Sequence, residues 1–193
     1  MHAVQQTIGW LACAIYSTIP CFWLLIHPHA EFWRSRRFSA YYIVVPIWLA
    51  MWTAMAALTY PWRHWRFYPG PWGWLPAAIL FYLGFWLYRK AGASFSWKQL
   101  GGFPELHGNS GEHRLVTDGI RQRMRHPVYL AHLLEMLGWC IGTGLFVCYA
   151  LTAFAILTGA VMIRTEDAEL ERRFGAEFRA YREAVTAILP RVL

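Results

Sequence analysis

The sequence has little charge for its length. Only 15% of its 193 residues are Asp, Glu, Lys or Arg, whereas 57% are hydrophobic. Soluble domains carry roughly 25% charged residues, so this composition disfavours an ordinary soluble domain. The 12 Trp, 12 Phe and 10 Tyr residues also disfavour a disordered, collagen-like or coiled-coil chain. We therefore expect one compact, all-α integral membrane protein.

Several common functional motifs are missing. The four cysteines lie in apolar stretches without a CxxC pair, which disfavours a disulfide scaffold and a zinc knuckle. The eight histidines show neither HxxxH nor HxxHH spacing, so we expect no metal site. Neither a P-loop nor a nucleophile elbow is present. The glycine pair Gly142 and Gly144 follows no strand, so a dinucleotide-binding loop is not expected.

Apolar runs predict about five transmembrane helices, since a spanning helix needs about 20 mostly apolar residues. Two helices are expected in Val128–Ile163, as a hairpin that turns near Ile141–Leu145. Its first arm has only about 14 residues after Pro127, about 21 Å of helix. The other three expected spans are Ile8–His27 with a kink at Pro20, Tyr41–Tyr60 with Pro46, and Trp72–Tyr88.

Basic residues predict the orientation of these spans. Sixteen of the 18 Lys and Arg residues fall in the segments 28–40, 89–127 and 164–193. The other two, Arg63 and Arg66, lie between the second and third spans. The positive-inside rule then places the C-terminus in the cytoplasm and the N-terminus outside. Basic residues that face an anionic leaflet also explain the net charge of +7 without nucleic acid.

The chain divides into two regions. Residues 1–88 hold three N-terminal transmembrane helices, and residues 89–193 hold the expected site. Within the second region, residues 165–189 predict an amphipathic cytoplasmic helix that lies on the bilayer surface or caps the bundle. Its apolar stripe consists of Leu170, Phe174, Phe178, Tyr181, Val185 and Ile188.

The junction between polar and apolar sequence at 113–135 is the most informative stretch. Pro127 fits the first turn of a helix, where free N–H groups beside Arg121, Arg123 and Arg125 suit an anionic group. The alternative is a basic membrane anchor. Glu135 is the one carboxylate within the expected spans, and His132 precedes it by three residues. This pair either marks a functional cavity or ties two helices together.

Two sequence blocks resemble the isoprenylcysteine carboxyl methyltransferase family, whose wider relatives include membrane phospholipid methyltransferases. The resemblance covers about residues 89–193. The first block is Leu115–Gly119 followed by Arg125–Tyr129. The second block contains Glu166–Leu170, Phe174, Gly175, Phe178, Tyr181 and Val185 through Pro190.

The resemblance implies S-adenosylmethionine as a methyl donor held at the cytoplasmic face, and a lipophilic methyl acceptor that enters from the bilayer. Either His132 or Glu135 could take a proton from an amine or thiol acceptor. Arg164 is a candidate cation for a carboxylate acceptor, so these three residues are the candidate catalytic residues. The implied cofactor-binding residues are His113, Arg114, Leu115, Val116, His126, Pro127, Tyr129 and Glu166.

The chain departs from the family pattern at three positions. Members that methylate a prenylcysteine carboxylate carry an arginine four residues before the glutamate, where this chain has Met162. Arg164 is about 200° around the helix from Glu166. Arg121 replaces a frequent aromatic residue and Asp167 replaces a second glutamate. We therefore expect acids to be poor acceptors.

Two other functions stay open. An NADPH-dependent reductase related to the sterol reductases would share the C-terminal architecture. A non-catalytic membrane scaffold would keep the fold without the chemistry.

Overall fold

The computed structural model describes residues 2–93, 106 and 114–189. Within these ranges the chain is helical, and its one β-type pairing is an isolated bridge between Arg66 and Leu145. The helices are α1 (His2–Ser17), α2 (Ile19–Ile26), η1 (His27–His29), α3 (Ala30–Arg34), α4 (Tyr41–Thr59), η2 (Tyr60–Trp62), α5 (Trp74–Gly92), η3 (Gly119–Gln122), α8 (Pro127–Thr143), α9 (Phe146–Phe174) and α10 (Ala176–Ala184).

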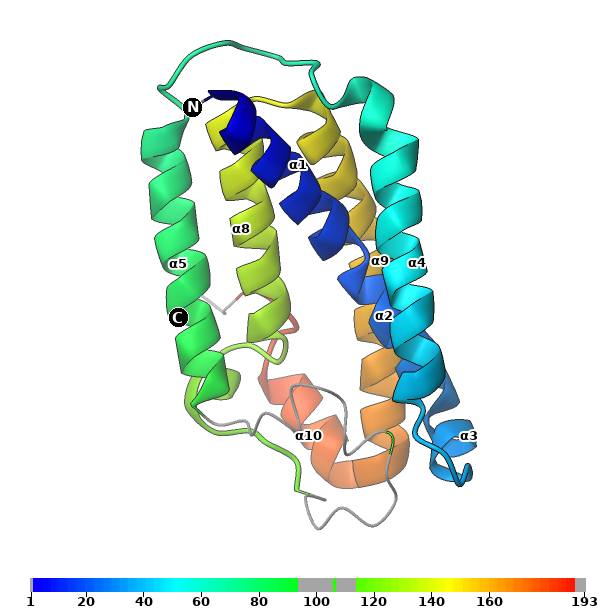
Figure 1. Cartoon of the computed structure of the whole chain (residues 1–193). Helices are drawn as coiled ribbons and strands as arrows, with labels where there is room; N and C mark the ends of the chain where they lie inside the picture. Colours follow the sequence, from blue (N-terminus) through cyan, green and yellow to red (C-terminus); the bar gives the residue numbers. More distant parts are fainter. Residues whose placement is uncertain (1, 94–105, 107–113, 190–193) are drawn as a thin grey trace.

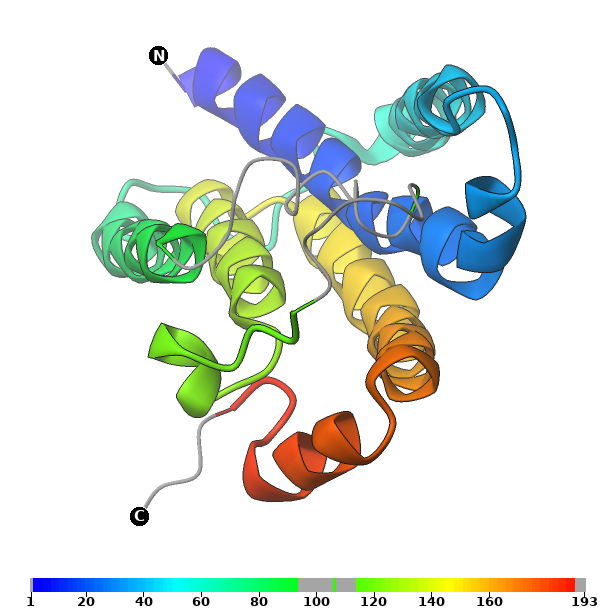
Figure 2. The same cartoon turned by 90° about the horizontal axis from the view of Figure 1, so that it is seen from below.

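The long helices run side by side as a bundle (Figure 1). The helix α5 packs along α8, and α1 packs against both α8 and α9. The helix α4 contacts the bundle mainly through α1 and α2. Seen from below, α4 and α5 lie on opposite sides of α8 and α9 (Figure 2). The short helix α10 lies across one end of the bundle (Figure 1).

Three described stretches are long and apolar enough to cross a membrane, namely Ala3–Arg34, Tyr41–Trp62 and Phe146–Phe174. The membrane character and the all-helical class that the sequence predicts are thus confirmed. The helices α5 and α8, with 19 and 17 residues, run beside these three. The number of five spans stays a prediction.

The helix expected over Ile8–His27 is interrupted near Pro20, where the sequence predicted a kink. Pro20 lies in the first turn of α2, and the break itself is at Thr18, between α1 and α2. A proline lacks the N–H that would continue the helix from α1. The Thr18 hydroxyl donates to the carbonyl of Ile15 at 2.7 Å and accepts a bond from the Trp48 indole at 3.0 Å. The break therefore also fastens α4 to the bundle.

The chain reverses direction between α8 and α9 at Gly144 and Leu145. Gly144 has φ 66°, the left-handed conformation that ends many helices, and its N–H donates to the carbonyl of Cys140 at 2.9 Å. The α4–α5 connection docks on this turn, because the N–H of Phe67 donates to Gly144 and the N–H of Phe146 to Trp65, each at 2.9 Å.

The prediction of one amphipathic helix over 165–189 is wrong. Residues up to Phe174 extend α9, and Gly175 at φ 56° then turns the chain into the separate helix α10. A glycine in this region of φ carries no Cβ penalty, so it ends the helix. The apolar stripe continues around the bend, and its members Phe174 and Phe178 line one cavity.

The bundle core contains three of the four thiols. Cys13, Cys140 and Cys148 are buried between α1, α8 and α9, and no cysteine in the described part of the chain forms a disulfide. Among the described residues, no group of three His, Cys, Asp or Glu side chains is arranged to hold a metal ion.

We predict that Gly159→Ala destabilises the protein. The Tyr129 hydroxyl donates to the carbonyl of Ala155, and a Cβ at Gly159 would overlap the Tyr129 phenol. Overpacking of this kind costs about 1–3 kcal/mol. Thermal unfolding in detergent should show a lower Tm for Gly159→Ala. The matched control is Gly92→Ala, where a new Cβ meets nothing within 4 Å. Equal Tm values for the two variants would contradict this packing.

Candidate functional site

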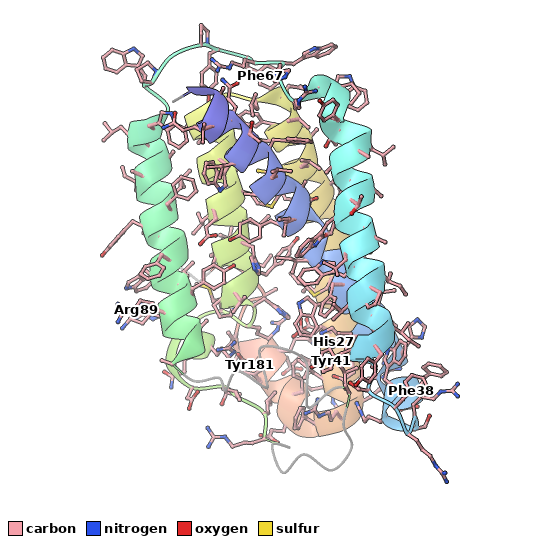
Figure 3. All side chains as sticks on the ribbon, in the orientation of Figure 1. His27, Phe38, Tyr41, Phe67, Arg89 and Tyr181 are labelled. Atoms are coloured by element: carbon pink, nitrogen blue, oxygen red, sulfur yellow. The ribbon has the colours of Figure 1, made fainter. Side chains whose placement is uncertain are left out.

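A cavity of about 890 Å³ lies at the α10 end of the bundle, lined by residues of α2, α4, α5, α8, α9 and α10 and of the segment before α8. In Figure 3, Tyr181 of α10 lies on one side of this space, and His27 and Tyr41 lie on the other. The apolar part of the lining includes Phe22, Trp23, Val45, Trp48 and Met162. The charged part includes Arg121, Arg125, His126, Glu166 and Arg173.

His126 links the start of α8 to two carboxylates on α9. Its Nε2 lies 3.1 Å from Asp167 Oδ1, and its Nδ1 lies 3.2 Å from Glu166 Oε2. Arg125 completes the cluster with Nη2 at 2.6 Å from Asp167 Oδ2. Each imidazole nitrogen faces a carboxylate oxygen, so both nitrogens donate in the protonated ring.

The protonated form of His126 is favoured by this arrangement. Burial by itself lowers the pKa of His126, but the negative charges of Glu166 and Asp167 outweigh burial and raise this pKa to about 9. The ring is therefore cationic at neutral pH. A buried charge of this kind is tolerated only because it is paired.

The segment after α10 is fastened to the start of α8 through its backbone. The N–H groups of Arg125 and His126 donate to the carbonyls of Thr186 and Ala187, each at 2.9 Å. The Arg125 guanidinium also donates to the carbonyl of Val185. The Tyr181 hydroxyl donates to the carbonyl of Arg121 at 2.7 Å. These bonds hold α10 across the end of the cavity.

Arg121 supplies a buried cation to the cavity wall. Its side chain is only 6% exposed, and Nη1 donates to the carbonyl of Ala91 at 3.1 Å. Burial lowers the pKa of Arg121, whereas Tyr181, Glu166 and Asp118 oppose this shift. Burial raises the pKa of Tyr181 to about 12, against the effect of Arg121 and Arg125. Arg121, which replaces a frequent aromatic residue of the family pattern, is therefore a cavity residue.

The structure brings most of the residues implied by the family resemblance to this one cavity. His113 lies outside the described residues. The Tyr129 hydroxyl is used in the contact between α8 and α9, as described above, while the residue also lines the cavity. The predicted site residues that line the cavity are Arg114, Leu115, Val116, His126, Pro127, Tyr129, His132 and Glu166.

His132 and Glu135 have different surroundings. His132 lines the cavity, and its ring centroid lies 5.3 Å from that of Tyr16 and 5.2 Å from that of Tyr88. Glu135 is not among the lining residues and accepts a bond of 2.5 Å from the Tyr16 hydroxyl. Glu135 also packs against Gly84, where a Cβ would lie 2.9 Å from its Cγ. Glu135 therefore ties α8 to α1 and packs against α5, which corrects the expectation that it acts in the cavity. The expected pair is divided, because His132 lines the cavity and Glu135 does not.

Arg164 is not brought to the cavity, which corrects the expectation that it acts there. It is exposed and lines a separate surface groove together with Arg172. The reason is helical phase, since two residues along α9 rotate a side chain by about 200° from Glu166. Met162, four residues before Glu166, is the one that lines the cavity.

His27 is a cavity residue that the sequence analysis missed. It is 4% exposed, stacks on Trp23 with centroids 5.2 Å apart, and lines the cavity. Its Nδ1 has no hydrogen-bond partner among the residues that the structure describes. The one sequence signal was its position at the end of the first apolar run, outside the region that resembles the family.

Sequence comparison with known proteins identifies relatives of this chain. The sequence model of a family described as phospholipid methyltransferase matches residues 73–177. Protein-S-isoprenylcysteine O-methyltransferase B of Arabidopsis thaliana is 34% identical over 83 residues, which make up 40% of this chain and 40% of the relative. A probable protein-S-isoprenylcysteine O-methyltransferase of Oryza sativa subsp. indica is 32% identical over 84 residues, 41% of this chain and 42% of the relative.

The chain thus aligns with about two fifths of the length of these curated relatives. No solved structure matches the chain significantly.

We predict that the His126 cluster makes stability fall at alkaline pH. Folding raises the pKa of His126 from about 6.5 to about 9, so its contribution is complete below pH 6.5 and is lost as the pH rises through 9. Tm measured from pH 6 to pH 10 should therefore fall more steeply for wild type than for His126→Gln. Parallel pH profiles for the two proteins would contradict a protonated His126.

Proposed function

Because this chain belongs to the phospholipid methyltransferase family, whose sequence model spans residues 73–177, we propose that it is an integral-membrane methyltransferase that uses S-adenosylmethionine. Its proposed acceptor is a lipophilic small molecule or a lipid-modified cysteine. The observation that carries the proposal is one cavity with a charged end and an aromatic end, in which the family-matched residues converge.

The charged end suits the chemical groups of S-adenosylmethionine. The Glu166 carboxylate can accept bonds from ribose hydroxyls or an ammonium group, and Arg121 can pair with the carboxylate of the amino acid moiety. Aromatic side chains can stack on adenine or face a sulfonium. The unsatisfied Nδ1 of His27 offers one more hydrogen-bonding group in the cavity wall.

The aromatic end suits a lipophilic acceptor. Phe22, Trp23 and Trp48 line it from α2 and α4, two helices that belong to the membrane-spanning stretches. An acceptor in the bilayer can reach these side chains without crossing water. By the positive-inside rule, the charged end lies on the cytoplasmic side of the membrane.

When bound, S-adenosylmethionine supplies an electrophilic methyl group. The protein then contributes position and exclusion of water, which together supply much of the rate in such a site. His132 lines the cavity, and in this proposal its imidazole takes the proton that an amine or a thiol acceptor must lose. Glu135 acts at a distance by holding Tyr16, which packs against the His132 ring.

We predict that His126→Ala and Glu166→Ala each weaken binding of S-adenosylhomocysteine, the product form of the donor. Glu166→Ala removes a carboxylate that can bond the ligand, and His126→Ala removes the imidazole that holds this carboxylate in place. Loss of a charge-assisted hydrogen bond is worth about 1.5–3 kcal/mol, or about 10- to 150-fold in Kd. Isothermal titration with purified protein in detergent would measure this change.

A matched control for this experiment is Glu171→Ala, also on α9. Glu171 pairs with Arg179 and Arg182 at the surface and does not line the cavity, so its Kd should equal that of wild type. Unchanged Kd values in folded His126 and Glu166 variants would contradict the proposed donor site. Binding of NADPH in competition with S-adenosylhomocysteine would favour the reductase, and binding of neither would favour the scaffold.

We predict that prenylcysteine acids are poorer acceptors than thiols or amines with the same prenyl group. A buried carboxylate without a cation costs several kcal/mol. Several cations of the cavity lining are already paired, Arg114 with Asp118, Arg125 with Asp167 and Arg173 with Glu169. Methyl transfer from labelled donor to this panel should rank the acids last.

The substitution Met162→Arg places a cation at the cavity and should raise turnover of the acids. The matched control Met162→Leu keeps the apolar volume and should leave the ranking unchanged. Efficient turnover of acids by wild type, with no gain from Met162→Arg, would show that another cation receives the carboxylate.

A further inference from the structure

A second hollow lies on the outer face of α9 and is separate from the methyltransferase cavity. It is a groove of about 420 Å³ between α9 and η1, and none of its lining residues lines the larger cavity. The lining residues are Pro28, Val161, Arg164, Thr165, Ala168 and Arg172.

Two arginines of α9 line this groove. Arg164, Ala168 and Arg172 are spaced by four residues and therefore lie on one face of α9. Side chains of a helix lean toward its N-terminus, so Arg172 leans back over Ala168 toward Arg164. The small Ala168 side chain leaves room between them.

No carboxylate is among the described residues that line the groove. Arg164 and Arg172 form no ion pair there, whereas the neighbouring Glu169 is paired with Arg34 and Arg173. Planar guanidinium groups match the geometry of phosphate oxygens. The charge of the groove is therefore complementary to an anion.

The depth of Arg164 matches that of a lipid head group. The 18 residues Phe146–Ile163 carry no charge and rise about 27 Å, close to the roughly 30 Å of bilayer hydrocarbon. Arg164 is the first charged residue after this run. Leu157 and Val161, which are 70% and 52% exposed, continue the same face of α9 toward the bilayer.

We propose that this groove binds an anionic phospholipid. Its phosphate lies between Arg164 and Arg172, and one acyl chain follows Val161 and Leu157. The exposed Val161 and Leu157 side chains favour a lipid over a free phosphate, because a free phosphate has no acyl chain to pack against them. The site is independent of the donor and the acceptor of methyl transfer.

The test is lipid binding by the full chain in neutral detergent, followed by native mass spectrometry. Phosphatidylglycerol should bind more tightly than phosphatidylcholine. An arginine near an anionic lipid surface contributes about a fivefold change in binding. The double variant Arg164→Gln/Arg172→Gln should therefore bind phosphatidylglycerol about 30-fold more weakly.

The matched control is Arg66→Gln/Arg123→Gln, which removes two exposed arginines that line neither hollow. It should bind phosphatidylglycerol as wild type does. Ala168→Phe fills the groove without changing charge and should also weaken binding. Equal binding by the groove and control variants would overturn the site. Displacement of the lipid by equimolar glycerol 3-phosphate would assign the groove to a soluble phosphate instead.

Discussion

The contact on which the described site depends is the pairing of one imidazole with two carboxylates at the end of the bundle. His126 immediately precedes α8, and Glu166 and Asp167 belong to α9, so this pairing joins the start of α8 to α9. Charges so well buried are costly unless they are paired. The pairing thus determines which rotamers the cluster can adopt, and with them the shape of the charged end of the cavity.

The cavity has both an apolar aromatic lining and a charged lining, because it lies where the enclosing helices pass from apolar to polar sequence. Phe22, Trp23 and Trp48 of its aromatic lining come from α2 and α4, within stretches able to span a membrane. Most of its charged lining residues come from α9 and the segment before α8. Residues 1–88 and 89–193 therefore both contribute to it. A water-soluble donor and a membrane-soluble acceptor could meet there without either one leaving its own solvent.

The sequence predicted features that depend on local pattern. The span Tyr41–Tyr60 agrees with α4 to within one residue, and the cavity contains the motif around His126. Features that depend on a break in a helix or on tertiary packing were missed. The stripe from Leu170 to Ile188 has helical spacing even though Gly175 bends the chain within it. His27 and Glu166 line the same cavity although 139 positions separate them in the sequence, and no local sequence pattern predicts such a contact.

Because the chain bends at Gly175, the number of residues in the last part of α9 determines where α10 lies. Each residue inserted between Glu166 and Gly175 would turn α10 by about 100° about the α9 axis and lift it by about 1.5 Å. Phe178 and Tyr181 would then face away from the cavity that they now close. Substitutions on the outer surface of this part of α9 leave that register unchanged. Relatives that keep this cavity should therefore vary here in composition and hardly at all in the number of residues.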